Sequence, residues 1–284
     1  MDSGGYTDIE NAALRARYAA VFAPRGRTGW ALAAAALALL AFGLWHLGFS
    51  PGRFFSGLNR LGDFIIFMFP PDWGNPATLK RFLRSLGETV AIAFLGTLLA
   101  AIFALPLSLL AARNTTVSQF LRFFTRRSFD TLRGVDTLIW ALIWINVVGL
   151  GPFAGVLAIA ISDIGSLGKL FSEAIEASDE RSVEGVKASG GAKLHGIRFG
   201  LLPQVAPVLI GQVLYFFESN TRSATILGIV GAGGIGLEIS EMIRTLEWQK
   251  VAFLIIMILI TVSVIDRLSS LLRNAIAGSK AAPI

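Results

Sequence analysis

The sequence predicts an all-α integral membrane protein with about six transmembrane helices. Of the 284 residues, 54% are hydrophobic and only 15% are charged, whereas an ordinary soluble protein carries about 25% charged residues. The mean hydropathy is +0.65, and the charged residues gather between long apolar runs. Helices satisfy their own backbone hydrogen bonds, so this pattern suits a chain that crosses lipid several times.

The N-terminal part is expected to hold the first span. Residues 1–28 are polar and basic and are predicted to form a cytoplasmic segment, and residues 30–49 form an apolar run long enough for one helix. A cleaved signal peptide is the alternative, but the leader is long and no convincing small-residue cleavage site follows. We expect 29–85 to comprise this span and an interfacial or extracytoplasmic loop, although five basic residues in the loop count against an outside position.

Residues 86–275 are expected to form the core transmembrane domain, and 276–284 a cytoplasmic tail. Five further apolar runs fall in this domain and are predicted as spans two to six: 86–112, 134–148, 153–164, 205–226 and 251–272. The third and fourth runs are short, so their polar ends must lengthen each helix to the span of a bilayer.

The distribution of basic residues predicts the orientation. Seventeen of the 25 lysines and arginines lie in 1–28, 113–133, 169–203 and 267–284. Under the positive-inside rule these segments, and hence both termini, lie in the cytoplasm of a cell with the chain in its inner or plasma membrane. The net charge of +6 therefore suits topology and anionic membrane lipid, and we expect no nucleic-acid partner.

A polar island over 172–203 interrupts the apolar pattern. Ser178 can cap a helix that ends at the glycine pair 190–191, because glycine tolerates the left-handed conformation after a helix. A second short helix, 192–200, is expected to end before Pro203. We expect these two short helices, which lie between spans, to protrude into water, and we call them the knob. The alternative is a solvated helical hairpin that binds no partner.

The spacing in this island resembles the EAA loop of ABC importer permeases, in which Glu-Ala-Ala is followed after three residues by Gly and later by a branched apolar residue and Leu-Pro. The positions that fit are Glu184, Gly190, Leu202 and Pro203. The positions that depart are Gly185 and Val186, where the pattern has alanines, and Gly200, where it has the branched residue. In that family the loop is the coupling helix, which docks into a groove on a cytoplasmic ATPase. The resemblance implies that the ATPase-coupling residues are Glu184, Lys187, Gly190, Gly191, Lys193, Leu202 and Pro203.

A second resemblance covers about residues 80–275. The run 222–236 is similar to the region after the coupling loop in phosphonate-type permeases, and methionine-type permeases have a similar glycine-rich run. Other segments that look phosphonate-type are 132–134, 139–142, 248–249 and 266–269. This resemblance implies the ABC importer permease fold, with a cytoplasmic coupling helix, in a subunit that forms the pathway for phosphonate or phosphite anions.

The glycine-rich run also satisfies the dinucleotide fingerprint G-x-G-x-x-G at 231–236. That fingerprint needs a preceding strand within an α/β unit, and here a predicted span precedes it. A flexible loop is one alternative, and close backbone packing at a pore or gate is another. We therefore include Gly231, Gly233 and Gly234 among the pathway candidates.

Ionisable residues near spans are candidates for function. Glu218 and Arg222 are four residues apart and share one face of a helix. They form either a structural ion pair or a polar lining in which Arg222 and Asn220 meet a phosphonate anion in transit. Glu88 and Asp136 are expected to lie at helix ends.

The sequence lacks the motifs of an enzyme. It has no cysteine and two histidines, so we predict no metal site and no catalytic residues. It lacks G-x-x-x-x-G-K-[ST], so no cofactor is expected on this chain, and ATP and Mg are expected on a partner ATPase. The resemblance implies a second permease subunit (a copy or a close paralogue), two ATPases and an extracytoplasmic binding protein. The alternatives are a permease for methionine or another small solute, a membrane-embedded enzyme using Glu218 and Arg222, and a non-transporting assembly or sensor subunit.

Overall fold

The computed structural model describes residues 26–278, and the elements in this range are helices connected by short loops. The chain divides after Ile66 into two compact units, which are described separately. The expected boundary at 85/86 falls inside a helix. The expected N-terminal segment lies almost wholly outside the described residues, and so does most of the expected tail.

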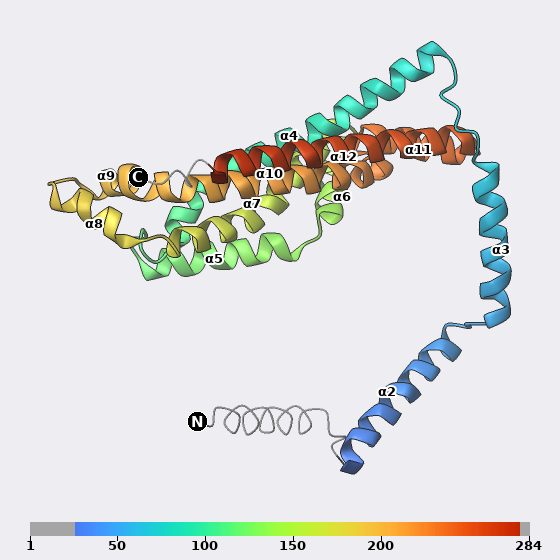
Figure 1. Ribbon diagram of the computed structural model, residues 1–284, viewed down its shortest axis with the longest axis horizontal. Coiled ribbons are helices and arrows are strands. Elements are labelled where there is room, and N and C mark those ends of the chain that lie inside the picture. Colours follow the sequence, from blue (N-terminus) through green and yellow to red (C-terminus); the bar gives the residue numbers. More distant parts are fainter. Residues whose placement is uncertain (1–25, 279–284) are drawn as a thin grey trace, which may run out of the picture. The chain divides into compact units, whose positions relative to one another are not determined.

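The first unit contains two exposed helices, α2 (Gly26–His46) and α3 (Pro51–Phe67) (Figure 1). Alanine and leucine dominate α2, and both favour the helix. Its 18 residues from Gly29 to His46 are apolar enough to cross a membrane, in agreement with the first predicted span. In α3 the apolar residues recur on one face and none is buried, which is the pattern of a helix lying in a membrane interface.

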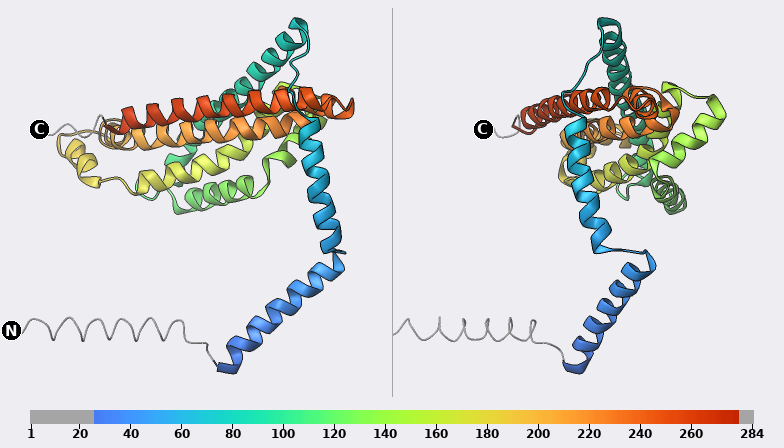
Figure 2. Two further views of the ribbon diagram at one scale, coloured as in Figure 1. Left: turned by 45° about the vertical axis from the view of Figure 1, so that its right-hand side comes forward. Right: turned by 90° about the vertical axis from the view of Figure 1, so that its right-hand side faces the viewer.

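The second unit is a helical bundle. Its elements are α4 (Pro76–Ala111), α5 (Gln119–Gly134), α6 (Thr137–Val148), α7 (Pro152–Glu176), α8 (Glu180–Ala188), α9 (Lys193–His195), η1 (Gly196–Leu201), α10 (Leu202–Leu227), η2 (Gly228–Ala232), α11 (Ile235–Arg244) and α12 (Trp248–Gly278), where η marks a π-helical turn. Helices α4, α7, α10 and α12 pack side by side and α5 lies along α7 (Figures 1 and 2). Helices α8 and α9 lie at one end of the bundle, and α6 and α11 lie at the other.

Small residues let α4 and α7 approach closely. A Cβ added to Gly96 of α4 would lie 2.7 Å from the side chain of Ile159 on α7, and Ala93, Ala100 and Ala158 are fully buried. In lipid, helices gain little from excluding water from each other, so they associate through such close packing. The contact between α4 and α7 is therefore the centre of the fold.

Within residues 26–278, five helical segments are long and apolar enough to cross a membrane, and the number rises to six if the bent pair α5 and α6 counts as one span. The third predicted span, 134–148, is not one continuous helix, because α6 has only 12 residues and α5 meets it at a bend of 88°. The expected loop 113–133 is mostly the helix α5. It packs tightly on α7, since a Cβ at Gly165 would lie 2.8 Å from backbone atoms of α5. Asp136 caps α6 at the bend by accepting the Leu138 N–H at 2.8 Å, as expected of a helix-end residue.

Two helices begin or continue where the sequence predicted a break. Helix α4 begins at Pro76, ten residues before the predicted span, because Asn75 accepts the Thr78 N–H at 2.8 Å and proline suits the first helical turn. At the other site, Pro203 does not end a helix. The wider π-turn η1 leads directly into α10, with the Leu202 N–H bonded to Ile197 O. A proline lacks the N–H of a regular helix, and such widened turns accommodate irregular hydrogen bonding.

Candidate functional site

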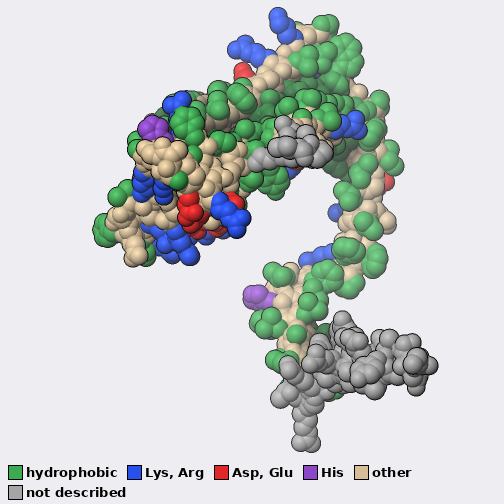
Figure 3. All heavy atoms as spheres, turned by 60° about the vertical axis from the view of Figure 1, so that its left-hand side comes forward, with side chains coloured by type: hydrophobic (Ala, Val, Ile, Leu, Met, Phe, Trp, Pro, Cys, Tyr) green, Lys and Arg blue, Asp and Glu red, His purple; other side chains and the backbone are tan. Residues whose placement is uncertain are grey.

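The predicted knob is present as α8, α9 and η1 at one end of the bundle, where Figure 3 shows basic and acidic side chains gathered. Residues 172–176, which the sequence places in the loop 172–203, belong instead to the end of α7, which extends to Glu176. The cap of α8 is Asp179, which accepts the Arg181 N–H at 2.9 Å. The predicted cap, Ser178, instead donates to Ile175 O. Either residue type can cap a helix, and the extent of α7 decides between them.

The end of α8 agrees with the prediction. Gly190 has φ +88°, its N–H bonds Lys187 O at 2.9 Å, and the Gly191 N–H bonds Val186 O at 3.0 Å. This pair of bonds is a Schellman motif, in which the residue after the cap takes the left-handed conformation that glycine adopts without strain. A Cβ at Gly191 would lie 2.7 Å from Val186 O, so both glycines shape the turn between α8 and α9.

Three of the predicted coupling residues surround one pocket of about 130 Å³. Glu184 and Lys187 face it from α8, and Lys193 faces it from the start of α9. Asn114 and Thr115 of the loop between α4 and α5 also line it. These three charged residues are exposed and form no ion pair among the described residues, so their charges are available to another chain. Leu202 and Pro203 lie outside this pocket, at the start of α10.

The departure from the family pattern at Gly200 has a structural reason. A Cβ there would lie 2.9 Å from Val183 Cα and 3.0 Å from Ser182 O, and a Cβ at Gly196 would lie 3.2 Å from the Val183 side chain. The two glycines bring η1 against the backbone of α8. A branched residue at position 200 has no room in this arrangement.

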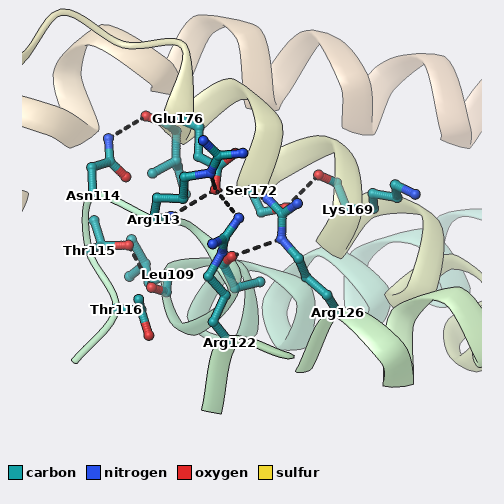
Figure 4. Close-up of polar contacts among 12 residues, drawn as sticks. Leu109, Arg113, Asn114, Thr115, Thr116, Arg122, Arg126, Lys169, Ser172 and Glu176 are labelled. Atoms are coloured by element: carbon teal, nitrogen blue, oxygen red, sulfur yellow. Dashed lines mark hydrogen bonds and ion pairs between the residues drawn. The ribbon is translucent and has the colours of Figure 1, made fainter. Parts of the chain in front are cut away.

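A cluster of three arginines around Glu176 anchors the other side of the knob. The Glu176 Oε1 atom lies 2.8 Å from Arg126 Nη2, 3.6 Å from Arg122 Nη2 and 4.0 Å from Arg113 Nε, and it also accepts the Arg113 N–H at 2.8 Å. Figure 4 shows these side chains pointing toward the carboxylate. We call these four residues the Glu176 cluster. It joins the end of α7 to α5 and to the loop after α4, three residues before the cap of α8.

Gln204 ties the knob to α10. Its side-chain amide donates to Asp179 O at 3.1 Å and to Gly200 O at 2.8 Å, and its Oε1 accepts the Asp179 N–H at 3.2 Å. The Glu176 cluster therefore holds the end of α7 just before α8, and Gln204 holds the cap residue of α8 itself. A displacement of α8 would act on α4, α5, α7 and α10 together, because packed elements move as units.

The structure separates the polar pathway candidates. Glu218 accepts from Arg222 at 3.2 Å and lies 3.7 Å from Arg273 of α12, so the predicted ion pair exists and has a third member. Asn220 contacts other residues, donating to Asp163 of α7 at 2.5 Å and to Thr97 of α4 at 2.8 Å. Residues 218 and 220 are two apart on a helix and do not face each other. Asn220 therefore joins the core of the bundle and does not lie beside Arg222.

The glycine candidates form a buried turn between α10 and α11. Gly231, Gly233 and Gly234 have φ values of +109°, +79° and +72°, and a Cβ at Gly234 would lie 2.4 Å from Thr89 Oγ1. The Ile235 N–H donates to the same Thr89 hydroxyl at 2.8 Å. No strand precedes this turn among the described residues, and the glycines serve close backbone packing.

Three charged residues with polar partners inside the bundle were not predicted from the sequence: Asp163, Glu176 and Glu238. Asp163 lies within a predicted span, and the rule for intramembrane ionisable residues would have found it. Glu238 also lies in a largely apolar segment, where its carboxylate meets Arg81 Nε at 3.1 Å and Ser85 Oγ at 3.1 Å. Glu176 gave no such signal, because its arginine partners are 50 to 63 positions away.

Comparison with known proteins identifies the chain. The profile of the family described as "Binding-protein-dependent transport system inner membrane component" matches residues 104–278. The "Putative phosphite transport system permease protein HtxC" of Stutzerimonas stutzeri is 39% identical over 90% of each chain. The "Phosphate-import permease protein PhnE" of Mycolicibacterium smegmatis is 38% identical over 73% of this chain and 38% of its own length.

The fold is also similar to a solved structure. A chain of an inward-facing MetNI methionine ABC transporter superposes with a TM-score of 0.63 at 17% identity, over 72% of this chain and 99% of that one. At this identity the likeness concerns the fold alone. Together with the helical bundle and its knob, these findings show that the chain is not an enzyme but an inner-membrane, multi-pass permease subunit of an ABC importer, and that it belongs to the family of binding-protein-dependent transport system inner membrane components.

Proposed function

We propose that this permease carries a phosphorus oxyanion, namely phosphite or a phosphonate. The observation that carries the proposal is the similarity to a phosphite permease along nine-tenths of both chains. A second phosphite permease, protein PtxC of Stutzerimonas stutzeri, is 34% identical over 81% of this chain. Methionine is the weaker alternative, since only the fold supports it.

The family implies a separate ATPase and a binding protein as partners. The finer assignment is part of the proposal: two permease subunits form the pathway, two ATPases hold ATP and Mg, and the binding protein delivers the anion from outside. Both termini and the knob lie in the cytoplasm, as the basic residues favour. In this arrangement the pocket beside Glu184, Lys187 and Lys193 faces the ATPase.

The knob is proposed to work as the coupling helix. ATP binding closes the ATPase dimer and displaces α8. The Glu176 cluster and Gln204 pass this displacement to the four bundle helices that they join. The pathway then alternates its opening, because a packed bundle shifts between discrete arrangements.

Uptake in cells that lack phosphonate and phosphite import tests the substrate. The chain is expressed with its ATPase and binding protein, and labelled aminoethylphosphonate, phosphite, phosphate and methionine are offered separately. We expect uptake of phosphite or the phosphonate that disappears when this chain is omitted. Uptake of methionine alone, or of none of the four by an assembled complex, would contradict the proposed substrate.

Arg222 is proposed to meet the anion in transit. Its side chain is 51% exposed and lies beside the buried Glu218, and a guanidinium recognises tetrahedral oxyanions through paired N–H donors. Replacing Arg222 by glutamine is expected to lower phosphite uptake about tenfold, as for the loss of one charged hydrogen bond. Arg244→Gln, which removes an exposed arginine with no ion pair among the described residues, is the matched control.

The triple variant Glu218→Gln, Arg222→Gln and Arg273→Gln separates this role from a purely structural group, because Glu218 also lies 3.7 Å from Arg273. A structural ion group can be replaced by neutral residues of similar shape at little cost. Uptake at the wild-type rate in the triple variant would therefore assign the group to structure and contradict a role for Arg222 in transit.

A further inference from the structure

The region where α5 meets α7 and the loop after α4 carries more positive charge than its carboxylates neutralise. Two basic residues pair with Asp130, Arg127 at 3.4 Å and Lys169 at 3.1 Å, and three arginines share Glu176. Within residues 26–278, five cations thus meet two carboxylates in this region. Each guanidinium carries five N–H donors and each carboxylate offers about four acceptor sites, so the two carboxylates cannot accept from all of these donors.

An open hollow of about 450 Å³ lies along these arginines. It is lined by Gln119, Arg122, Phe123, Arg126 and Arg127. A smaller hollow of about 60 Å³ lies beside it and shares Arg126 and Arg127. The buried Nε of Arg122 makes no hydrogen bond with any described residue. The hollow is therefore lined by three guanidinium groups whose positive charge exceeds the negative charge of their nearby carboxylates, Glu176 and Asp130.

The first turn of α5 adds to the attraction for an anion. Ser118 occupies the cap position without a side-chain hydrogen bond to the helix, and a helix N-terminus favours negative charge. Beside it, three phenylalanines stay exposed: Phe120 by 72%, Phe123 by 58% and Phe124 by 52%. The Arg127 guanidinium lies 5.7 Å from the Phe123 ring centroid, so the basic and aromatic surfaces are continuous.

From this arrangement we propose that the 450 Å³ hollow, which we call the α5 hollow, binds the phosphate group of an anionic phospholipid. The arginines supply the charge complementarity for the phosphate, and the exposed phenylalanines supply an apolar surface for the acyl chains, as on amphipathic helices at membrane surfaces. Inorganic phosphate shares the headgroup chemistry but would leave the phenylalanines uncovered. The lipid tethers α5, and through Arg122 and Arg126 it touches the Glu176 cluster. This inference does not depend on which solute the permease carries.

The test measures lipid retained by the full-length chain purified with its ATPase. The complex is exposed to equal amounts of phosphatidylglycerol and phosphatidylcholine, and bound lipids are counted by native mass spectrometry. We expect preferential retention of phosphatidylglycerol by the wild type, and about fivefold weaker retention after Arg127→Gln or Gln119→Glu. Glutamate in the first turn favours the helix itself, so weaker retention by Gln119→Glu cannot come from loss of α5.

Arg84→Gln is the matched control, since it removes a charge from α4 whose side chain is 84% exposed and pairs with Glu88 one turn further on. Equal phosphatidylglycerol retention by the wild type, both α5 variants and this control would overturn the proposal. A second arm adds inorganic phosphate without lipid. If phosphate binds there, is lost in the α5 variants, and phosphatidylglycerol is not retained, the site takes a free anion and the lipid assignment is wrong.

Discussion

Replacing Glu176 by glutamine is expected to uncouple ATP hydrolysis from transport. The substitution removes the single carboxylate that Arg113, Arg122 and Arg126 share, and it leaves three mutually repelling cations at the entry to α8. Removing one partner of a buried ion pair costs about 3–5 kcal/mol. Because the Glu176 side chain is 20% exposed, we expect a smaller loss of stability of about 2–3 kcal/mol.

The decrease in coupled transport should be larger than any decrease in the amount of assembled protein. We expect the chain to insert and to assemble with its ATPase, while phosphite transport per ATP hydrolysed falls about tenfold in proteoliposomes, as for a loss of more than 1.4 kcal/mol in coupling. Glu173→Gln is the matched control, because Glu173 lies on the same helix with its side chain exposed and outside any ion pair of the described residues. Transport by Glu176→Gln at the rate of Glu173→Gln would show that the Glu176 cluster plays no part in coupling.

Replacing Gly200 by valine is expected to disrupt the knob, although it restores the branched residue of the EAA pattern. The new Cβ would lie 2.9 Å from Val183 Cα and 3.0 Å from Ser182 O. These are largely backbone atoms of α8, so relief requires η1 and α8 to separate. Overpacking of this kind costs about 1–3 kcal/mol, and we expect the variant to lose most of its co-purification with the ATPase and most of its transport.

Gly185→Ala provides the matched control, since it restores one of the pattern's alanines in the same helix. A Cβ at Gly185 would meet no atom within 4 Å, and alanine is favoured over glycine in a helix by about 0.5–1 kcal/mol. We expect normal transport from this variant. If Gly200→Val also transports normally, the close packing of η1 on α8 is not the working arrangement of the coupling segment.

The sequence alone determined the features that depend on local chemistry and on lipid. Hydropathy located the apolar runs 153–164, 205–226 and 251–272 within single helices, because backbone polar groups in lipid must be satisfied within the segment. The glycine pair at 190–191 predicted the end of α8, because the left-handed conformation there favours glycine. The spacing around Glu184 and Gly190 indicated the permease family, which the comparisons confirmed.

Only the tertiary structure decided which distant residues meet. Gly165 and Gly168 leave room on α7 for α5 to pack closely. The expected polar loop 113–133 is therefore mostly a helix. Glu176 gains its arginines from segments 50 to 63 positions away, and Asn220 turns to Asp163 and Thr97, away from Arg222. Such pairings follow from the close approach of whole helices. The sequence shows which small residues permit helices to pack closely, but it does not show which two helices pack against each other.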